Sequence, residues 1–233
     1  MLAIYKRDTA SYFRTMSGYI FFAVIFVVAG YAFCAENVIG GAGDLTGMFS
    51  ALAAAMVFTV PFMSARLYFD GREINTEQML YVSSIKIILA KFFAVMSVAS
   101  AGVAATWIYA GILSIFGSLH IAELLLYQAG LILLAGAMAA LTMFIVSISN
   151  RKMQVIVLLT MFVAVMFAAN GVLNAADGGI YAKLLGLLGL FYEYSGFGLG
   201  ILSLPAVVYM LAFMTVFILL ACAMTERHRE RGL

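Results

Sequence analysis

Six segments of the chain are long, apolar and almost free of charge, and they restrict the possible folds more than any other feature. A helix needs about 20 apolar residues to cross the hydrocarbon core of a membrane. Each segment has 18 to 25 residues, and Arg66, at the end of the second, is the one charged side chain within them. The segments are Gly18–Ala35, Gly47–Leu67, Phe92–Phe116, Leu124–Ile148, Met153–Leu173 and Ser203–Met224. They predict an all-α, polytopic membrane protein with about six transmembrane helices.

The composition supports the same fold class. Of the 233 residues, 65% are hydrophobic and 10% are charged. Soluble domains carry roughly 25% charged residues, and a soluble particle with so few charges could not cover its surface with polar groups. The six segments and their connections take up the chain, which predicts a single transmembrane domain over residues 1–233.

The basic residues alternate between connections in a way that orients the helices. If the amino terminus is cytoplasmic, 12 of the 13 lysine and arginine residues lie on the cytoplasmic side, and only Lys183 lies outside. Cytoplasmic loops of membrane proteins are enriched in these residues. We therefore expect a multi-pass protein of the bacterial inner, cytoplasmic membrane with both termini in the cytoplasm.

Three segments outside the predicted spans have compositions of their own. Residues 1–17 place Tyr12 and Phe13 among basic residues, which favours an amphipathic helix lying at the cytoplasmic interface. Residues 68–91 form the long inner loop, and residues 174–202 form the long outer one. The outer loop is apolar but broken by glycines, so we expect short re-entrant helices there rather than a seventh span.

The inner loop is the most informative of the three. We expect it to begin with a charged turn at Asp70–Glu73, followed by a short amphipathic helix at about Asn75–Val82. Asn75 or Thr76 can cap that helix. Glu77 and Gln78 follow in its first turn, where acidic and hydrogen-bond-accepting side chains favour the positive end of a helix. A projecting helix of this kind suits docking in a groove of a cytoplasmic partner. The alternative is a solvated loop whose charges only set the topology.

Several chemical motifs are missing from the sequence. It has no GxxxxGK[ST] phosphate loop, no HExxH, and no carboxylate, histidine or cysteine cluster in the spans to act as a catalytic group. His120 and His228 are predicted on opposite sides of the membrane and cannot share a metal. Cys34 and Cys222 are also expected at opposite ends, too far apart for a disulfide. We expect no catalytic, cofactor-binding or metal-binding residues in this chain.

The residues of the inner loop follow a specific order. An Arg-Leu-aromatic start is followed by an acidic-basic cluster, and then by Thr-Glu-Gln, a leucine and a serine. These positions are Arg66, Leu67, Tyr68, Asp70, Arg72, Thr76, Glu77, Gln78, Leu80 and Ser83. In this order and length the loop resembles that of ABC-2 type permeases, the membrane subunits of one class of ATP-binding-cassette transporter. The sequence departs from the family pattern at Gly71, Asn75 and Ser84.

Two further stretches carry the same resemblance. Towards the carboxy terminus an aromatic-acidic segment leads to a small-residue turn, a final span and an acidic-basic tail. These positions are Tyr192, Glu193, Phe197, Gly200, Leu202, Glu226 and Arg227. They resemble the gliding-motility-type branch of these permeases. At the amino terminus the matching residues are Lys6-Arg7-Asp8 and Tyr12-Phe13, leading to Gly18-Tyr19-Ile20.

The resemblance implies a function and a set of partners. The chain would be the permease subunit of an ABC transporter, and of an exporter, because the family mostly exports. A pair of permease subunits, identical or homologous, would form the translocation path within the lipid. A pair of separate ATPase subunits would bind ATP and Mg²⁺ and hydrolyse the ATP. The chain would then not be an enzyme by itself, and no nucleic acid is expected as a partner.

The resemblance also assigns the contact with the ATPase to the inner loop. The coupling residues would be Asp70, Arg72, Glu73, Thr76, Glu77, Gln78, Met79, Leu80 and Ser83. Closure of the ATPase pair on ATP would move the element Asp70–Ser84 and tilt the bundle between inward-open and outward-open states. The alternative function is a membrane scaffold or sensor subunit that recruits a cytoplasmic partner and transports nothing.

Overall fold

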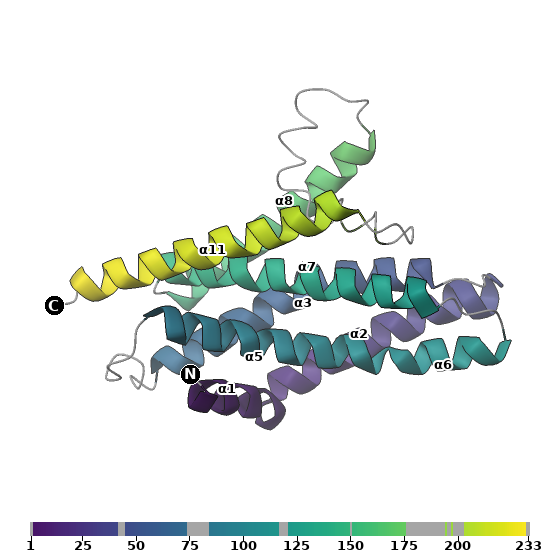
Figure 1. Cartoon of the computed structure of the whole chain (residues 1–233), viewed down its shortest axis with the longest axis horizontal. Coiled ribbons are helices and arrows are strands. Elements are labelled where there is room, and N and C mark those ends of the chain that lie inside the picture. Colours follow the sequence, from purple (N-terminus) through teal and green to yellow (C-terminus); the bar gives the residue numbers. More distant parts are fainter. Residues whose placement is uncertain are drawn as a thin grey trace.

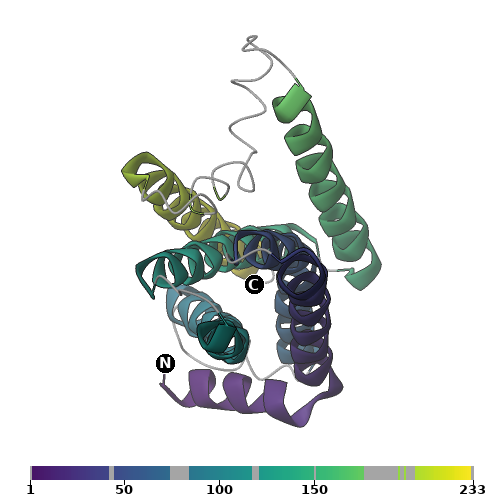
Figure 2. The same ribbon diagram turned by 90° about the vertical axis from the view of Figure 1, so that its right-hand side faces the viewer.

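Helices form every secondary-structure element in the part of the chain that the computed structural model describes, which is residues 2–41, 45–73, 84–116, 121–149, 151–175, 194, 197 and 203–231. They are α1 (Leu2–Arg14), α2 (Met16–Phe33), the π-helix η1 (Cys34–Ile39), α3 (Thr46–Glu73), α5 (Ser84–Ala105), α6 (Trp107–Phe116), α7 (Ile121–Ile148), α8 (Lys152–Ala175) and α11 (Leu204–Arg231). Most of the long helices run back and forth along one axis (Figure 1). Figure 2, which looks along that axis, shows α1 lying across it.

Five of the described helical segments are long and apolar enough to cross a membrane. They are Met16–Ile39, Thr46–Leu67, Ile85–Ile115, Ile121–Ile148 and Leu204–Arg227. Each coincides with a predicted span, so the prediction of a polytopic, all-α membrane protein is confirmed at this level. The remaining predicted span, Met153–Leu173, falls on α8. The described apolar part of that helix, Lys152–Ala168, is shorter than the other five, and the sixth span stays a prediction.

Two of these segments are longer than the sequence predicted. The π-helix η1 continues α2 beyond Ala35, and the N–H of Gly40 donates to the Ala35 carbonyl at 3.1 Å. Helix α5 begins at Ser84 rather than near Phe92, and α6 continues it after a local break at Thr106. Polar residues at the end of an apolar run lower its hydropathy without ending its helix, which explains both differences.

A break at Thr15 separates α1 from α2. The Thr15 backbone is extended (φ −102°, ψ 153°), and its hydroxyl donates to the carbonyl of Ser11 at 2.9 Å. The turn brings the carbonyl oxygen of Tyr12 against Gly18, where a Cβ would overlap that oxygen. Gly18 therefore permits α1 to lie across the bundle, where it packs against α5 and α2.

Helix α7 lies at the centre of the packing. It contacts α3, α5, α8 and α11, and 78% of its most apolar stretch is buried, compared with 22% for α11. Small residues allow this close packing. A Cβ on Gly136 would be 2.9 Å from Met214 of α11 and 3.2 Å from Met96 of α5. The buried hydroxyls of Thr142 and Ser147 are satisfied within α7, since they donate to the carbonyls of Met138 at 2.7 Å and Met143 at 2.8 Å.

Candidate functional site

One end of the bundle, called the basic end here, holds α1, the last turns of α3, the start of α5, the α7–α8 junction and the last turns of α11. Figure 1 shows these segments towards the left and the other helix ends towards the right. The basic residues on these segments include Lys6, Arg7, Arg66, Lys86, Arg151 and Arg227. The structure thus gathers at one end the segments that the charge pattern grouped. Which side of the membrane this end faces stays a prediction.

The predicted coupling residues lie at the end of α3 and beyond it. Asp70, Arg72 and Glu73 belong to the last turns of α3, so the expected charged turn is helical instead. Arginine and glutamate are good helix formers, and the burial of Phe69 holds the preceding turn in place. The other predicted coupling residues lie outside the described residues; they are Thr76, Glu77, Gln78, Met79, Leu80 and Ser83. The docking role of all nine stays a prediction.

The last turns of α3 pack against α7 and α8. A small hydrophobic cluster joins the three helices; its buried members are Ala65 and Phe69 of α3, Leu141 and Val146 of α7, and Val155 and Leu159 of α8. The ammonium group of Lys152 lies over the Phe69 ring, 6.0 Å from its centroid, and this cation–π contact favours the same packing. Helix α3 is therefore held in place just before the predicted coupling segment.

Helix α1 bridges the two helices that flank residues 74–83. The hydroxyls of Tyr5 in α1 and Ser97 in α5 share a hydrogen bond of 2.7 Å. The Tyr12 hydroxyl donates to the carbonyl of Met63 in α3 at 3.2 Å. Met63 lies two residues beyond Pro61, which has no N–H to donate within the helix. The half of α3 at the basic end is therefore supported from outside by α1 as well as by α7 and α8.

Two charged side chains are buried in α1 and α5. Asp8 is 3% exposed and forms an ion pair with Arg7 at 2.9 Å, and Lys91 is 0% exposed. Its charge predicts that Lys91 belongs to the inner loop, whereas in the structure it lies within α5. Ile88 and Phe92, on either side of Lys91, are apolar and buried too. These apolar neighbours were the sign in the sequence that the helix begins before Lys91. Burying a charge is unfavourable unless its surroundings compensate it, so replacement of Lys91 tests how its surroundings interact with that charge.

At the other end of the bundle, two residues of the predicted outer loop are buried. Tyr194 and Phe197 are 2% and 1% exposed, and they lie against Gly130 of α7, where a Cβ would be 3.0 Å from Phe197. The Tyr194 hydroxyl donates to the carbonyl of Phe49 in α3. Burial raises the pKa of the Tyr194 hydroxyl, and the nearby Tyr127 raises it further. Most of that loop lies outside the described residues, so its re-entrant helices stay a prediction.

Side-chain hydrogen bonds join three helices at the same end. The hydroxyls of Thr46 in α3 and Tyr127 in α7 share one at 3.1 Å. The indole N–H of Trp107 in α6 donates to the amide oxygen of Gln128 in α7 at 2.7 Å. The partners are 81 and 21 residues apart in the chain, so the sequence alone could not pair them. In an apolar environment such bonds fix which helix faces meet.

Among the described residues, no group of three or more His, Cys, Asp or Glu side chains could hold a metal ion. Cys34 is exposed, Cys222 is buried, and both are free thiols. No protein-family model matches the chain, and no curated protein matches it in sequence. Evidence on its function therefore comes from the arrangement of its helices and charges and from the resemblance of its motifs to those of ABC-2 type permeases.

Proposed function

We propose that this chain is the permease subunit of an ABC transporter of the ABC-2 type and acts in export. A pair of permease subunits forms the translocation path, and a pair of separate ATPase subunits binds to its cytoplasmic side. The support is the order of three motifs along a chain of membrane-length helices. The motifs are Lys6–Ile20, Arg66–Ser83 and Tyr192–Arg227.

The observation that carries the proposal is the way in which α3 and α5 are held beside residues 74–83. Phe69 packs the end of α3 against α7 and α8, while Tyr12 and Tyr5 bond α1 to α3 and α5. A force applied at the end of α3 or at the start of α5 is therefore passed to a set of packed helices. Packed helices move as rigid bodies between discrete arrangements, as the coupling of ATP hydrolysis to transport requires.

In this proposal the chemistry of ATP hydrolysis belongs to the partner. The ATPase pair binds ATP and Mg²⁺, and its closure moves the coupling segment. Arg72 and Glu77 offer charged contacts to the ATPase, and Met79 and Leu80 offer apolar ones. The segment must bind the open and closed ATPase states with different affinities, because otherwise nucleotide binding would shift nothing in the permease.

The exposed thiol of Cys34 allows a direct test. Cys34 lies in η1, which continues α2 away from the basic end (Figure 1), and Cys222 is buried at 5% exposure, so a spin label will react selectively with Cys34. The chain is co-purified with its ATPase, labelled, and the distance between the labels of the two permease copies is measured with and without trapped nucleotide. We expect an equimolar complex and a nucleotide-dependent change in that distance. A Cys34→Ser variant gives the background.

Two other results would contradict the proposal in different ways. A stable, equimolar complex whose label distance ignores nucleotide would favour the scaffold or sensor function. Purification without any P-loop ATPase, from cells that express the chain at its natural level, would exclude both a permease of this kind and an ATPase-recruiting scaffold.

A further inference from the structure

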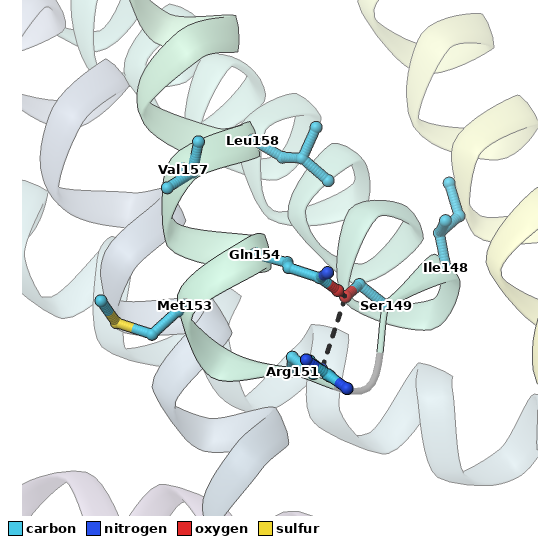
Figure 3. A pocket seen from close by; sticks show the side chains of 7 residues that line it. All are labelled: Ile148, Ser149, Arg151, Met153, Gln154, Val157 and Leu158. Carbon is cyan, nitrogen blue, oxygen red and sulfur yellow. Dashed lines mark hydrogen bonds between the residues drawn. The ribbon is translucent and has the colours of Figure 1, made fainter.

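A pocket of about 660 Å³ lies at the junction of α7 and α8, at the basic end of the bundle. Figure 3 shows the seven side chains that line it, Ile148, Ser149, Arg151, Met153, Gln154, Val157 and Leu158. The pocket is open over most of its extent, so an occupant would lie along its surface instead of being enclosed. The proposed transport mechanism assigns no role to it.

The polar side of the pocket fits an anion. None of the seven lining residues is acidic, and the Arg151 side chain is exposed. Ser149, 8% exposed, donates its hydroxyl to Oε1 of Gln154 at 2.8 Å and accepts from the Arg151 N–H at 3.4 Å. These bonds fix the turn and leave Nε2 of Gln154 as a donor. The neighbouring Lys152 lies over the ring of Phe69 instead, so Arg151 is the cation of the pocket.

The remaining lining side chains are apolar and accessible from outside the bundle, and they lie on both sides of the polar group (Figure 3). Ile148, Met153, Val157 and Leu158 are 46%, 75%, 60% and 43% exposed. Val157 and Leu158 lie farther along α8 than Arg151, so the cation stands at the helix end and the apolar side chains follow it along the axis. In a membrane protein this is the order of lipid headgroup and acyl chain at the boundary of the bilayer.

We propose that this pocket binds one anionic phospholipid, with its phosphate at Arg151 and Gln154 and an acyl chain along Val157 and Leu158. The guanidinium group presents several N–H donors in a planar geometry that matches phosphate oxygens. A free phosphate ion would use only the polar side and gain nothing from the apolar side chains. A lipid is therefore the occupant that uses the whole pocket. The inference does not rest on the proposed function, because it uses α7 and α8 alone.

Native mass spectrometry of the full chain in detergent tests this site, with phosphatidylglycerol as the anionic lipid and phosphatidylcholine as the neutral one. We expect the wild-type chain to retain phosphatidylglycerol more tightly. Arg151→Gln should weaken that binding about fivefold, the contribution of one basic residue near an anionic surface. Arg227→Gln is the matched control, because Arg227 is also basic, exposed and at the same end but does not line the pocket. It should leave the affinity unchanged.

A second variant probes the pocket without a change in volume. Gln154→Glu places a carboxylate beside the phosphate, so it should weaken the binding of phosphatidylglycerol more than that of phosphatidylcholine, whose choline cation offsets its own phosphate. Equal losses in Arg151→Gln and Arg227→Gln would overturn the proposal, because the lipid would then respond only to surface charge. Displacement of the lipid by millimolar inorganic phosphate would overturn it as well, since the site would then hold a free anion. So would equal retention of the two lipids by the wild-type chain.

Discussion

The hydroxyl of Tyr194 donates a hydrogen bond of 3.3 Å to the main-chain carbonyl of Phe49, which lies 145 residues earlier in the chain. The Phe49 ring in turn stacks on Tyr127 of α7, with ring centroids 5.1 Å apart. Phe49 lies in the first turn of α3, and the last turns of the same helix contain Asp70 and Glu73. Helix α3 therefore joins Phe49, which contacts Tyr194 of the predicted outer loop, to the start of the predicted coupling segment.

Replacement of Tyr194 measures how firmly this loop residue is held. Tyr194→Phe removes one hydrogen bond and should lower the free energy of unfolding by about 1 kcal/mol. Tyr194→Ala also leaves a cavity and should lower it by about 3 kcal/mol or more. Unfolding of the detergent-purified chain gives both values. Tyr31→Ala is the control, because Tyr31 is 76% exposed. If Tyr194→Ala were as stable as Tyr31→Ala, the loop would not be packed as the structure has it.

Gly18→Ala tests the close contact between α1 and α2. A Cβ at Gly18 would overlap the Tyr12 carbonyl oxygen, so the turn at Thr15 must open. We expect a loss of about 1–3 kcal/mol, as for other overpacked sites, with faster proteolysis near Thr15. Gly111→Ala in α6 is the matched control, because nothing lies within 4 Å of its Cβ position. It should be neutral or slightly stabilising, since alanine favours helix over glycine. Similar stability of the two variants would contradict the close approach of Tyr12 to Gly18.

Lys91→Ala tests whether the buried ammonium group is compensated by its surroundings. If it is, the substitution leaves the compensating groups unbalanced and creates a cavity, which should lower the free energy of unfolding by about 3 kcal/mol or more. Lys86→Ala, on an exposed position of the same helix, should change it by about 0.5 kcal/mol or less. Chemical denaturation of both variants in one detergent gives the comparison. A Lys91→Ala chain as stable as the wild type would show that the surroundings do not compensate the buried charge.

The topology can be read from the two free thiols. If the basic end faces the cytoplasm, Cys34 faces the outside, and a membrane-impermeant maleimide should label it in intact cells. Cys222 is buried and should stay unlabelled. A Cys34→Ser chain should therefore show no labelling. Reaction of Cys34 only after the cells are opened would place the basic end outside and reverse the charge-based prediction.

The coupling segment is tested by Glu77→Lys together with Leu80→Ala. Removal of an apolar anchor from a docked interface weakens binding by about 2 kcal/mol or more, and reversal of a charge adds repulsion. The double variant should release the ATPase from the detergent-purified complex, while membrane insertion stays normal because neither residue is in a predicted span. Glu193→Lys in the predicted outer loop is the control and should keep the ATPase bound. A double variant that retains the ATPase at wild-type stoichiometry would leave the segment a simple connection.

Hydropathy alone was sufficient to predict most of the helices. A membrane span must satisfy all of its backbone hydrogen bonds internally, so long apolar runs become helices whatever their neighbours are. The segment Ile121–Ile148 is the clearest case, since its apolar core was predicted as Leu124–Ile148. The same reasoning ends the helix too early at Asp70–Glu73, because a cluster of charges lowers the hydropathy although it does not break the helix.

What hydropathy could not predict is the packing at the two ends of the bundle. Hydropathy favours a loop at Lys91 because lysine lowers the local average, yet Lys91 is buried within α5, which packs against α1, α3, α7 and α11. The bond from Tyr194 to Phe49 joins segments with no sequence relationship. Such contacts depend on which helix faces meet, and that is decided by many small shape differences rather than by any local pattern.

The burial of α7 bears on how the protein is made. Together with α11, it has the most apolar sequence of the five membrane-length segments, although it is the one most shielded from lipid once the bundle is complete. The insertion machinery selects each span by its own apolarity as it emerges, and only afterwards do inserted helices associate. The leucines of α7 therefore serve its entry into the bilayer, whereas Gly136 and the surrounding alanines serve its later exchange of lipid neighbours for α3, α5 and α11.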